Sequence, residues 1–262
     1  MTAGPAAHDP VLVEACVDSV ASAVAAERGG AQRIELCAAL ADGGTTPSAG
    51  MIAACRKAVS IPLFVIVRPR GGGFNYSDDE RDVMRRDVIA ACELGADGIV
   101  TGGLRRDGTV DVALMQSIVE AAGDRPVTFH RAFDVTPAFD EALDVLAANG
   151  VHRVLTSGGA PTAIEGAAVL AALVRQAAER IVVMAGGGVR EENVREVVAT
   201  TGVREVHVRL TRLARDGTVH ADGIRIRKPL PVDETAWEET DEQRVRGLVT
   251  AVTRPPVGKH ES

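Results

Sequence analysis

The chain has 262 residues, of which 46% are hydrophobic and 25% charged, a composition typical of a globular protein with a substantial core. The net charge of −7 argues against a nucleic-acid-binding surface, although it allows a local basic pocket. No apolar run approaches the roughly 20 residues of a transmembrane helix, and the start of the chain lacks a secretory signal. We therefore expect a cytoplasmic protein that binds neither nucleic acid nor membranes, and its oligomeric state, including a homo-oligomer, stays open.

Alternating apolar segments and helical faces predict eight strands, each followed by a helix or a loop. The first helix is expected to be capped by Asp18, the second to follow Ser48, and the third to begin at a capping box of Ser77 and Glu80. A final helix is expected over Trp237–Val252. In chain order, the predicted strands span residues 11–16, 33–36, 63–67, 98–101, 127–130, 153–156, 181–185 and 205–209.

A repeated pattern leads into every second strand. It consists of a glycine, a small apolar residue, two mostly polar residues and a branched apolar residue, as in Gly30–Ile34, Gly95–Ile99, Gly150–Val154 and Gly202–Val206. The glycine ends a helix and the branched residue enters a strand. Four pairs of strand–helix units make eight strands, the number that closes a TIM barrel. An open doubly wound sheet is the alternative, and the short, evenly spaced strands argue against it.

The predicted fold is thus α/β, a single (β/α)8 TIM-type barrel with an irregular C-terminal extension. We expect the barrel domain, including this extension and the final helix, to span residues 11–253. Within the extension, Arg215–Val219 is typical of a hairpin turn. Residues 1–10 are expected to form a disordered leader, and residues 254–262 a loose tail.

Ionisable side chains recur at the predicted C-terminal ends of the strands, where TIM barrels place their active sites. Glu14, Glu35 and His130 are candidate catalytic acid–base residues. Thr156 and His207 are further candidate pocket residues. Buried carboxylates need partners, for which we expect the two histidines and an arginine at the end of the third strand. The alternative is an ion-pair network that only fills the barrel.

Two glycine-rich loops are candidate anion sites. The triplet of Gly186, Gly187 and Gly188 follows the seventh strand, where TIM-barrel loops commonly expose backbone N–H groups to phosphate. A second glycine run follows the third strand beside Arg68 and Arg70, whose guanidinium groups suit a carboxylate or a phosphate. Glycine runs alone are weak indicators, because tight turns also need glycine.

Two of the four cysteines are candidate metal ligands. Cys16 and Cys37 end consecutive strands, and neighbouring strands lie about 4.8 Å apart, so their thiols could share a metal. Soft thiolates favour copper(I) or zinc, and two sulfurs suit near-linear copper(I) better than tetrahedral zinc. The alternative is that both are small buried residues, as we expect for Cys55 and Cys92 on apolar helix faces.

Seven segments of the chain form a recognisable set: Glu14–Ser19, Arg33–Cys37, Asp42–Ser48, Arg68–Gly72, Tyr76–Asp78, Thr128–Asp134 and Val154–Gly158. Together they resemble the CutC family, known as copper-homeostasis proteins. The resemblance covers residues 11–207 and implies a cytoplasmic TIM barrel that binds copper(I), with the proposed ligands mapping onto Cys16 and Cys37. After His207 the chain departs from the family, which tends to have small residues where Val208, Arg209 and Leu210 follow here.

Two functions are compatible with these patterns. The first is a copper-homeostasis protein that binds copper(I) through paired thiolates at the barrel mouth. The second is an enzyme that acts on a small anionic metabolite, with glutamate and histidine as acid–base groups and an arginine–glycine anion site. The sequence leaves open whether the protein is an enzyme, and a metal could serve catalysis in either case.

Overall fold

The computed structural model describes residues 10–215, 217 and 235–253. The predicted leader, apart from Pro10, and the predicted tail lie outside the described residues. The same holds for residues 216 and 218–234, which include most of the predicted extension and most of its hairpin turn.

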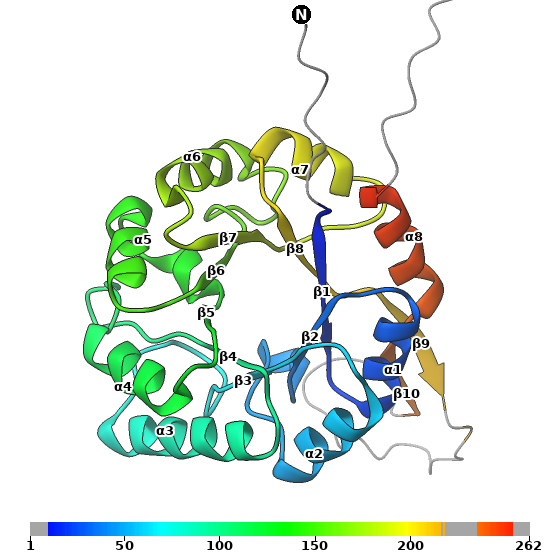
Figure 1. The fold of residues 1–262 in the computed structure, drawn as a ribbon, viewed down its shortest axis with the longest axis horizontal. Helices are drawn as coiled ribbons and strands as arrows, with labels where there is room; N and C mark the ends of the chain where they lie inside the picture. Colours follow the sequence, from blue (N-terminus) through cyan, green and yellow to red (C-terminus); the bar gives the residue numbers. More distant parts are fainter. Residues whose placement is uncertain (1–9, 216, 218–234, 254–262) are drawn as a thin grey trace, which may run out of the picture.

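Eight parallel strands close into a barrel in chain order, which confirms the predicted TIM barrel. Figure 1 looks into the barrel and shows helices arranged as an outer ring around the strands. The strands are β1 (Leu12–Val17), β2 (Arg33–Leu36), β3 (Leu63–Ile66), β4 (Gly98–Thr101), β5 (Val127–Phe129), β6 (Arg153–Thr156), β7 (Val182–Ala185) and β8 (Glu205–Val208). The helices of the ring are α1 (Val20–Arg28), α2 (Ala49–Ala58), α3 (Asp78–Glu93), α4 (Val112–Ala122), α5 (Phe139–Ala148), α6 (Ala167–Ala177) and α7 (Val194–Thr201).

The repeated glycine of the sequence pattern has one structural cause. Gly30, Gly95, Gly150 and Gly202 have φ angles of +93°, +93°, +77° and +74°, in the left-handed region. Residues with a Cβ are strained there, whereas glycine turns the chain from the helix end into the next strand without that cost. The pattern was therefore a local signal of the barrel's repeating unit.

Side chains cap several helices at their first turn. Ser77 and Glu80 form the predicted capping box at α3, and Ser48 caps α2. At α1, however, the cap is Ser19 and not Asp18, because the Ser19 side chain accepts a hydrogen bond from the N–H of Ser22.

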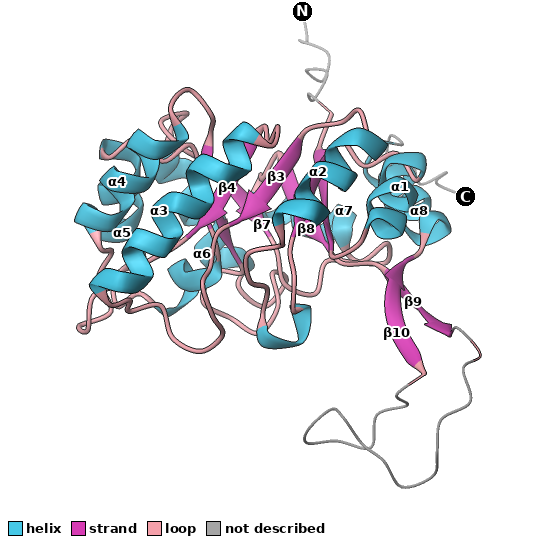
Figure 2. Ribbon diagram, turned by 90° about the horizontal axis from the view of Figure 1, so that it is seen from below, coloured by secondary structure: helices cyan, strands magenta, loops and turns pink. Residues whose placement is uncertain are grey.

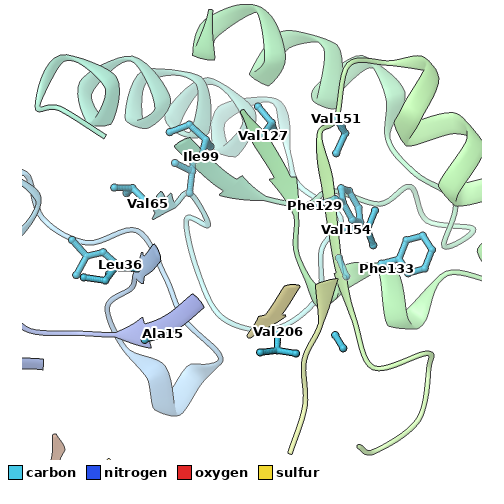
Figure 3. Close-up of a cluster of buried hydrophobic side chains, with 14 of the residues drawn as sticks. Ala15, Leu36, Val65, Ile99, Val127, Phe129, Phe133, Val151, Val154 and Val206 are labelled. Atoms are coloured by element: carbon cyan, nitrogen blue, oxygen red, sulfur yellow. The ribbon is translucent and has the colours of Figure 1, made fainter. Parts of the chain in front are cut away.

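The strands alternate between an outer apolar face and a more polar inner face. Outward residues such as Ile99, Phe129 and Val154 lie in the main apolar core between barrel and helices (Figure 3). Residues between them along the strands point into the barrel, and on β1 and β2 these include Glu14 and Arg33, which are both buried. The alternation therefore directs charged side chains and thiols toward the barrel axis.

The C-terminal part of the described chain departs from the prediction of one helix over Trp237–Val252. Ala236–Thr240 form β10, which pairs antiparallel with β9 (Thr211–Arg215) in a two-stranded ribbon outside the barrel (Figure 2). The helix, α8 (Glu242–Thr253), begins only after Asp241, whose carboxylate accepts from the N–H groups two and three residues later. Pairing with β9 thus overrides helical propensity at the start of this segment. No helix among the described residues is long and apolar enough to cross a bilayer.

Candidate functional site

A buried ion network fills the barrel below its C-terminal mouth. Arg33 donates hydrogen bonds to Glu14 and Glu205, and Arg153 donates two to Glu205, at 2.5 and 2.9 Å. The guanidinium carbons of both arginines lie over the Phe64 ring, 5.0 and 5.6 Å from its centroid. In this layer the barrel interior is filled by an ion-pair network, the alternative that the sequence left open for the charged residues.

The network connects to the mouth through Glu14 and His207. Glu14 Oε1 lies 2.8 Å from His207 Nδ1, and Glu14 is fully buried. Burial alone would raise the pKa of Glu14, but Arg33 and His207 more than offset it and lower the pKa to about 2. Glu14 is therefore an ionised carboxylate that fixes the ring of His207, and it does not line the cavity above.

The two candidate metal ligands, Cys16 and Cys37, lie together at the mouth, an arrangement that the sequence left possible. The register of β1 and β2 pairs Cys16 with Glu35, and Cys37 follows the end of β2. The two Sγ atoms lie 3.8 Å apart, and Cys37 Sγ lies 3.4 Å from Glu35 Oε2. One ligand atom of each of Cys16, Glu35 and Cys37 lies within 4.8 Å of the others, and all three residues are buried. His207 Nε2 is 3.7 Å from Glu35 Oε2.

The side chains of this cluster shift one another's pKa values. The hydrogen bond with Cys37 lowers the pKa of Cys16 well below its usual value, and the adjacent His207 adds to this effect. The same hydrogen bond, together with burial, raises the pKa of Cys37, while burial and the charge of Cys16 raise the pKa of Glu35. Burial would lower the pKa of His207, but Glu35, Cys16 and Glu14 raise it well above its usual value. These directions make Cys16 the more acidic of the two thiols and place it next to His207.

A cavity of about 440 Å³ opens above this cluster at the C-terminal ends of the strands. Of the sequence candidates, Glu14, Arg70, Thr156 and Gly186 do not line it. The lining residues are Cys16, Glu35, Cys37, Leu40, Gly43, Ile66, Arg68, Phe74, His130, Arg131, Leu155, Gly187, Gly188, Val189, Arg190, His207 and Arg209.

Arg70 was predicted as an anion-binding residue of the mouth, but it lies outside the cavity. Its Nε donates to Glu80, the carboxylate of the α3 capping box, and its Nη1 donates to the carbonyl of Gly73 at 2.9 Å. Arg68 does line the cavity, but it pairs with no carboxylate among the described residues. It donates to the carbonyl oxygens of Asp42, Gly44 and Gly72, and so holds the neighbouring loops together.

Thr156 points away from the cavity because strand alternation directs the neighbouring Leu155 inward. Its hydroxyl donates to Asp134, which also accepts from the N–H groups of Ser157 and Gly159. Asp134 also binds Arg131 Nε at 2.7 Å. This aspartate of the β5 motif is therefore an anchor for the loop after β6.

His130 lines the cavity but contacts neither candidate acid, so its predicted pairing with a carboxylate is wrong. Its Nδ1 accepts from the N–H of Ala132 at 3.1 Å, and the Phe74 ring lies 5.1 Å away. Burial, together with the charge of Arg68, lowers the pKa of His130 to about 3. The ring is neutral, its proton lies on Nε2, and this nitrogen is buried with no hydrogen-bond partner among the described residues.

The depressed pKa of His130 predicts a loss of stability in acid. The unfolded chain binds this proton below a pKa of about 6.5 and the folded protein only near 3. The free energy of unfolding should therefore fall as pH drops from 6.5 toward 3, by up to about 1.4 kcal/mol per pH unit. His130→Asn keeps an acceptor for Ala132 and should flatten this dependence in urea unfolding between pH 7 and 4.5. An unchanged slope in the variant would contradict the assignment.

Sequence reasoning missed the lower charged layer of Arg33, Arg153 and Glu205, and gave no role to Arg131 and Arg190 of the cavity wall. A signal for the lower layer was present, because charged residues occur at every second position of β2 and at the start of β6 and β8. For Arg190 no comparable signal exists, since it lies in the loop after β7.

The closed eight-stranded barrel and the Cys–Glu–Cys cluster at its mouth define a TIM-barrel protein with a candidate thiolate metal site. The chain belongs to the CutC family, whose sequence profile matches residues 11–211. It is 45% identical to the human copper homeostasis protein cutC homolog over 239 residues, which cover 90% of this chain and 87% of the relative. It is 50% identical to a CutC protein of Xylella fastidiosa strain Temecula1 over 195 residues, 74% of this chain and 73% of the relative.

Solved structures agree with this assignment. The crystal structure of a CutC protein from Streptococcus agalactiae matches with a TM-score of 0.73 at 36% identity, over 75% of this chain and 97% of that one. Phosphoribosylanthranilate isomerase from Thermotoga maritima matches with a TM-score of 0.55 at 11% identity, over 92% and 98% of the two chains. At that identity the second match shows the shared fold alone.

Proposed function

We propose that this protein binds copper(I) in the cytoplasm through Cys16 and Cys37 and acts in copper homeostasis. The observation that carries the proposal is the pair of buried sulfurs 3.8 Å apart beside the Glu35 carboxylate. Soft thiolates are the ligands that copper(I) prefers among protein side chains. The relatives from human and mouse, whose names refer to copper homeostasis, support the same metal.

The spacing of the donors favours a bent site over a linear one. With metal–sulfur bonds of about 2.3 Å, two sulfurs across a linear metal would lie about 4.6 Å apart. The Sγ atoms of Cys16 and Cys37 are closer than this, at 3.8 Å. A third donor therefore fits better than the near-linear coordination expected from two sulfurs alone, and both the Glu35 carboxylate and His207 Nε2 are at hand.

The residues beneath the cluster orient these donors. Arg33 holds Glu14, and Glu14 binds Nδ1 of His207, so that Nε2 faces Glu35. Carboxylate–histidine pairs of this kind fix the tautomer and the direction of a metal-binding imidazole. When copper(I) is bound, the chain thus supplies two thiolates and a preoriented third donor in a buried pocket.

Copper(I) titration of the reduced protein under anaerobic conditions, against a competing chromogenic chelator, tests the proposal. The double variant Cys16→Ser/Cys37→Ser should lose more than about 100-fold in copper(I) affinity. Mutating residues that only hydrogen-bond to metal ligands already lowers metal affinity about 10–100-fold, and this variant removes the ligands themselves. Cys92→Ala, in a helix of the outer ring, is the matched control and should bind as wild type. Equal affinity of the double variant and wild type would refute the proposal.

A second candidate function is acid–base chemistry on a small anionic metabolite. It is favoured by the cavity of about 440 Å³, which is far larger than a bare metal ion requires, beside Glu35 and His207. In this function the neutral His130 would serve as a hydrogen-bond donor, and Glu14 would orient His207 without touching substrate. Thermal stabilisation of the copper-free protein by small anionic metabolites would support it, and the absence of any stabilisation would count against it.

A further inference from the structure

The loop after β7 carries backbone donors that the fold leaves unused. The N–H groups of Gly187, Gly188 and Val189 have no hydrogen-bond partner among the described residues, and all three residues line the cavity. The N–H groups on either side of this run do have partners. That of Gly186 donates to the carbonyl of Thr156 at 2.9 Å, and that of Arg190 donates to Oδ1 of Asn193 at 2.8 Å. Such a run of free N–H groups is a concave site for an anion.

The orientation of this loop follows from its carbonyl groups. The carbonyl of Gly187 accepts from the N–H of Ala163, and that of Gly188 accepts from the side chain of Asn193. In a trans peptide the C=O and N–H groups point in opposite directions. The N–H groups of Gly188 and Val189 therefore point away from Ala163 and Asn193, which lie outside the cavity lining.

Two arginines of the lining lie beside these donors. The Arg131 guanidinium packs against Gly187, where an added Cβ would lie 3.6 Å from its carbon Cζ and from Nη1. Arg131 is held in place by Asp134, at 2.7 Å from Nε, and by Ser157, at 2.8 Å from Nη2. Arg190 continues the same loop and also lines the cavity. Guanidinium groups beside free N–H groups match the oxygens of a phosphate.

The charge of the cavity favours the same kind of ligand. Its lining contains four arginines and one acidic residue, Glu35, although the whole chain has a net charge of −7. Arg131 and Arg209 are paired with Asp134 and Glu238, whereas Arg68 and Arg190 form no ion pair among the described residues. Arg68 Nε and His130 Nε2 are buried donors of lining residues without a partner among the described residues, in side chains only 5% and 6% exposed. A cationic cavity with unsatisfied donors stabilises an anion that enters it.

We propose that the Gly187–Val189 loop, with Arg131 and Arg190, binds the phosphate group of a small organic phosphate whose remainder extends toward the thiol cluster. His207, which belongs to the cavity lining beside the thiol cluster, is also close to the start of this loop. A Cβ added at Gly186 would lie 3.3 Å from His207 Cβ. This inference names a substrate class for the second candidate function. Turnover of the bound organic phosphate would depend on that function. Binding of the phosphate group itself requires neither turnover nor copper.

Isothermal titration calorimetry with inorganic phosphate, in low-salt buffer without copper, tests the site. Gly188→Asp and Gly188→Asn form a matched pair, because both residue types tolerate the left-handed φ of +69° and place similar bulk near Thr162. Wild type should bind phosphate, and Gly188→Asp should abolish binding through charge repulsion. Gly188→Asn, with similar bulk but no charge, should bind phosphate more tightly than Gly188→Asp, and equal binding by the two variants would contradict a role for charge at this loop.

Two single arginine variants, one on each side of β7 in the chain, give a second test. Arg190→Ala should weaken phosphate binding about tenfold or more, since one charge-assisted hydrogen bond accounts for that difference. Arg180→Ala, at the opposite end of β7 and paired with Asp144, should leave it unchanged. Failure of wild type to bind phosphate, equal or tighter binding of acetate, or equal loss in both arginine variants would overturn the proposal.

Copper(I) titration of the same variants separates the two sites. Gly188→Asp should keep wild-type copper affinity, because its carboxylate would lie in the β7 loop and not among the thiols. Loss of phosphate binding with intact copper binding therefore supports two independent sites. Intact phosphate binding in a protein that fails to bind copper would leave the anion site standing and remove only the metal function.

Discussion

Replacing Arg33 with methionine should lower the free energy of unfolding by about 3–5 kcal/mol, because it leaves two buried carboxylates without their shared cation. Arg33 is 4% exposed and binds both Glu14 and Glu205 inside the barrel. Urea unfolding, followed by circular dichroism, measures the change as a shift of the midpoint. Since Glu14 orients His207, copper(I) affinity should fall in the variant as well.

The control variants identify the cause of this loss. Arg86→Met removes an arginine whose side chain is 70% exposed and paired with Asp82 on the surface of α3, and it should leave the midpoint nearly unchanged. Adding Glu14→Gln to Arg33→Met should recover part of the stability, because one uncompensated charge is then absent. If the double variant is no more stable than the single one, the loss arises from packing over Phe64 and not from charge.

Replacing Gly166 with alanine should destabilise the protein by about 3 kcal/mol through overpacking. The added Cβ would overlap the carbonyl oxygen of Ser157 and approach the Cα of Gly158 at 3.1 Å. Because these atoms belong to the backbone, the loop after β6 or the start of α6 must shift. Ser157 also holds Arg131, so phosphate binding should weaken in the same variant.

Gly73→Ala is the matched control for this variant. A Cβ at Gly73 meets nothing within 4 Å, and its φ is not positive. This substitution should leave the protein as stable or raise its stability by about 0.4–1 kcal/mol, since it restricts the unfolded chain. Thermal and urea unfolding of both variants would measure the difference, and equal stabilities would show that the loop after β6 accommodates the extra carbon.

Local sequence signals were sufficient to predict most of the barrel. The left-handed glycines, the α3 capping box and the alternation of strand residues are properties of short segments. They can therefore be recognised in the sequence without knowing which other segments pack against them. Prediction of secondary structure failed where pairing between distant segments decides between strand and helix. Trp237 lies in a strand because β9 is available to pair with it, and nothing within its own segment indicates that partner.

The sequence by itself placed Cys16 and Cys37 at the ends of consecutive parallel strands, where their thiols could come within range of one metal. The structure sets Glu35 opposite Cys16 in the register and brings the two Sγ atoms to 3.8 Å. Only the tertiary structure decided which charges surround them. Arg70 turns outward to a helix cap, and Arg68 binds loop carbonyls, although both follow the same strand. Long side chains reach several partners of similar energy, so their contacts depend on which loop atoms the closed barrel brings within range.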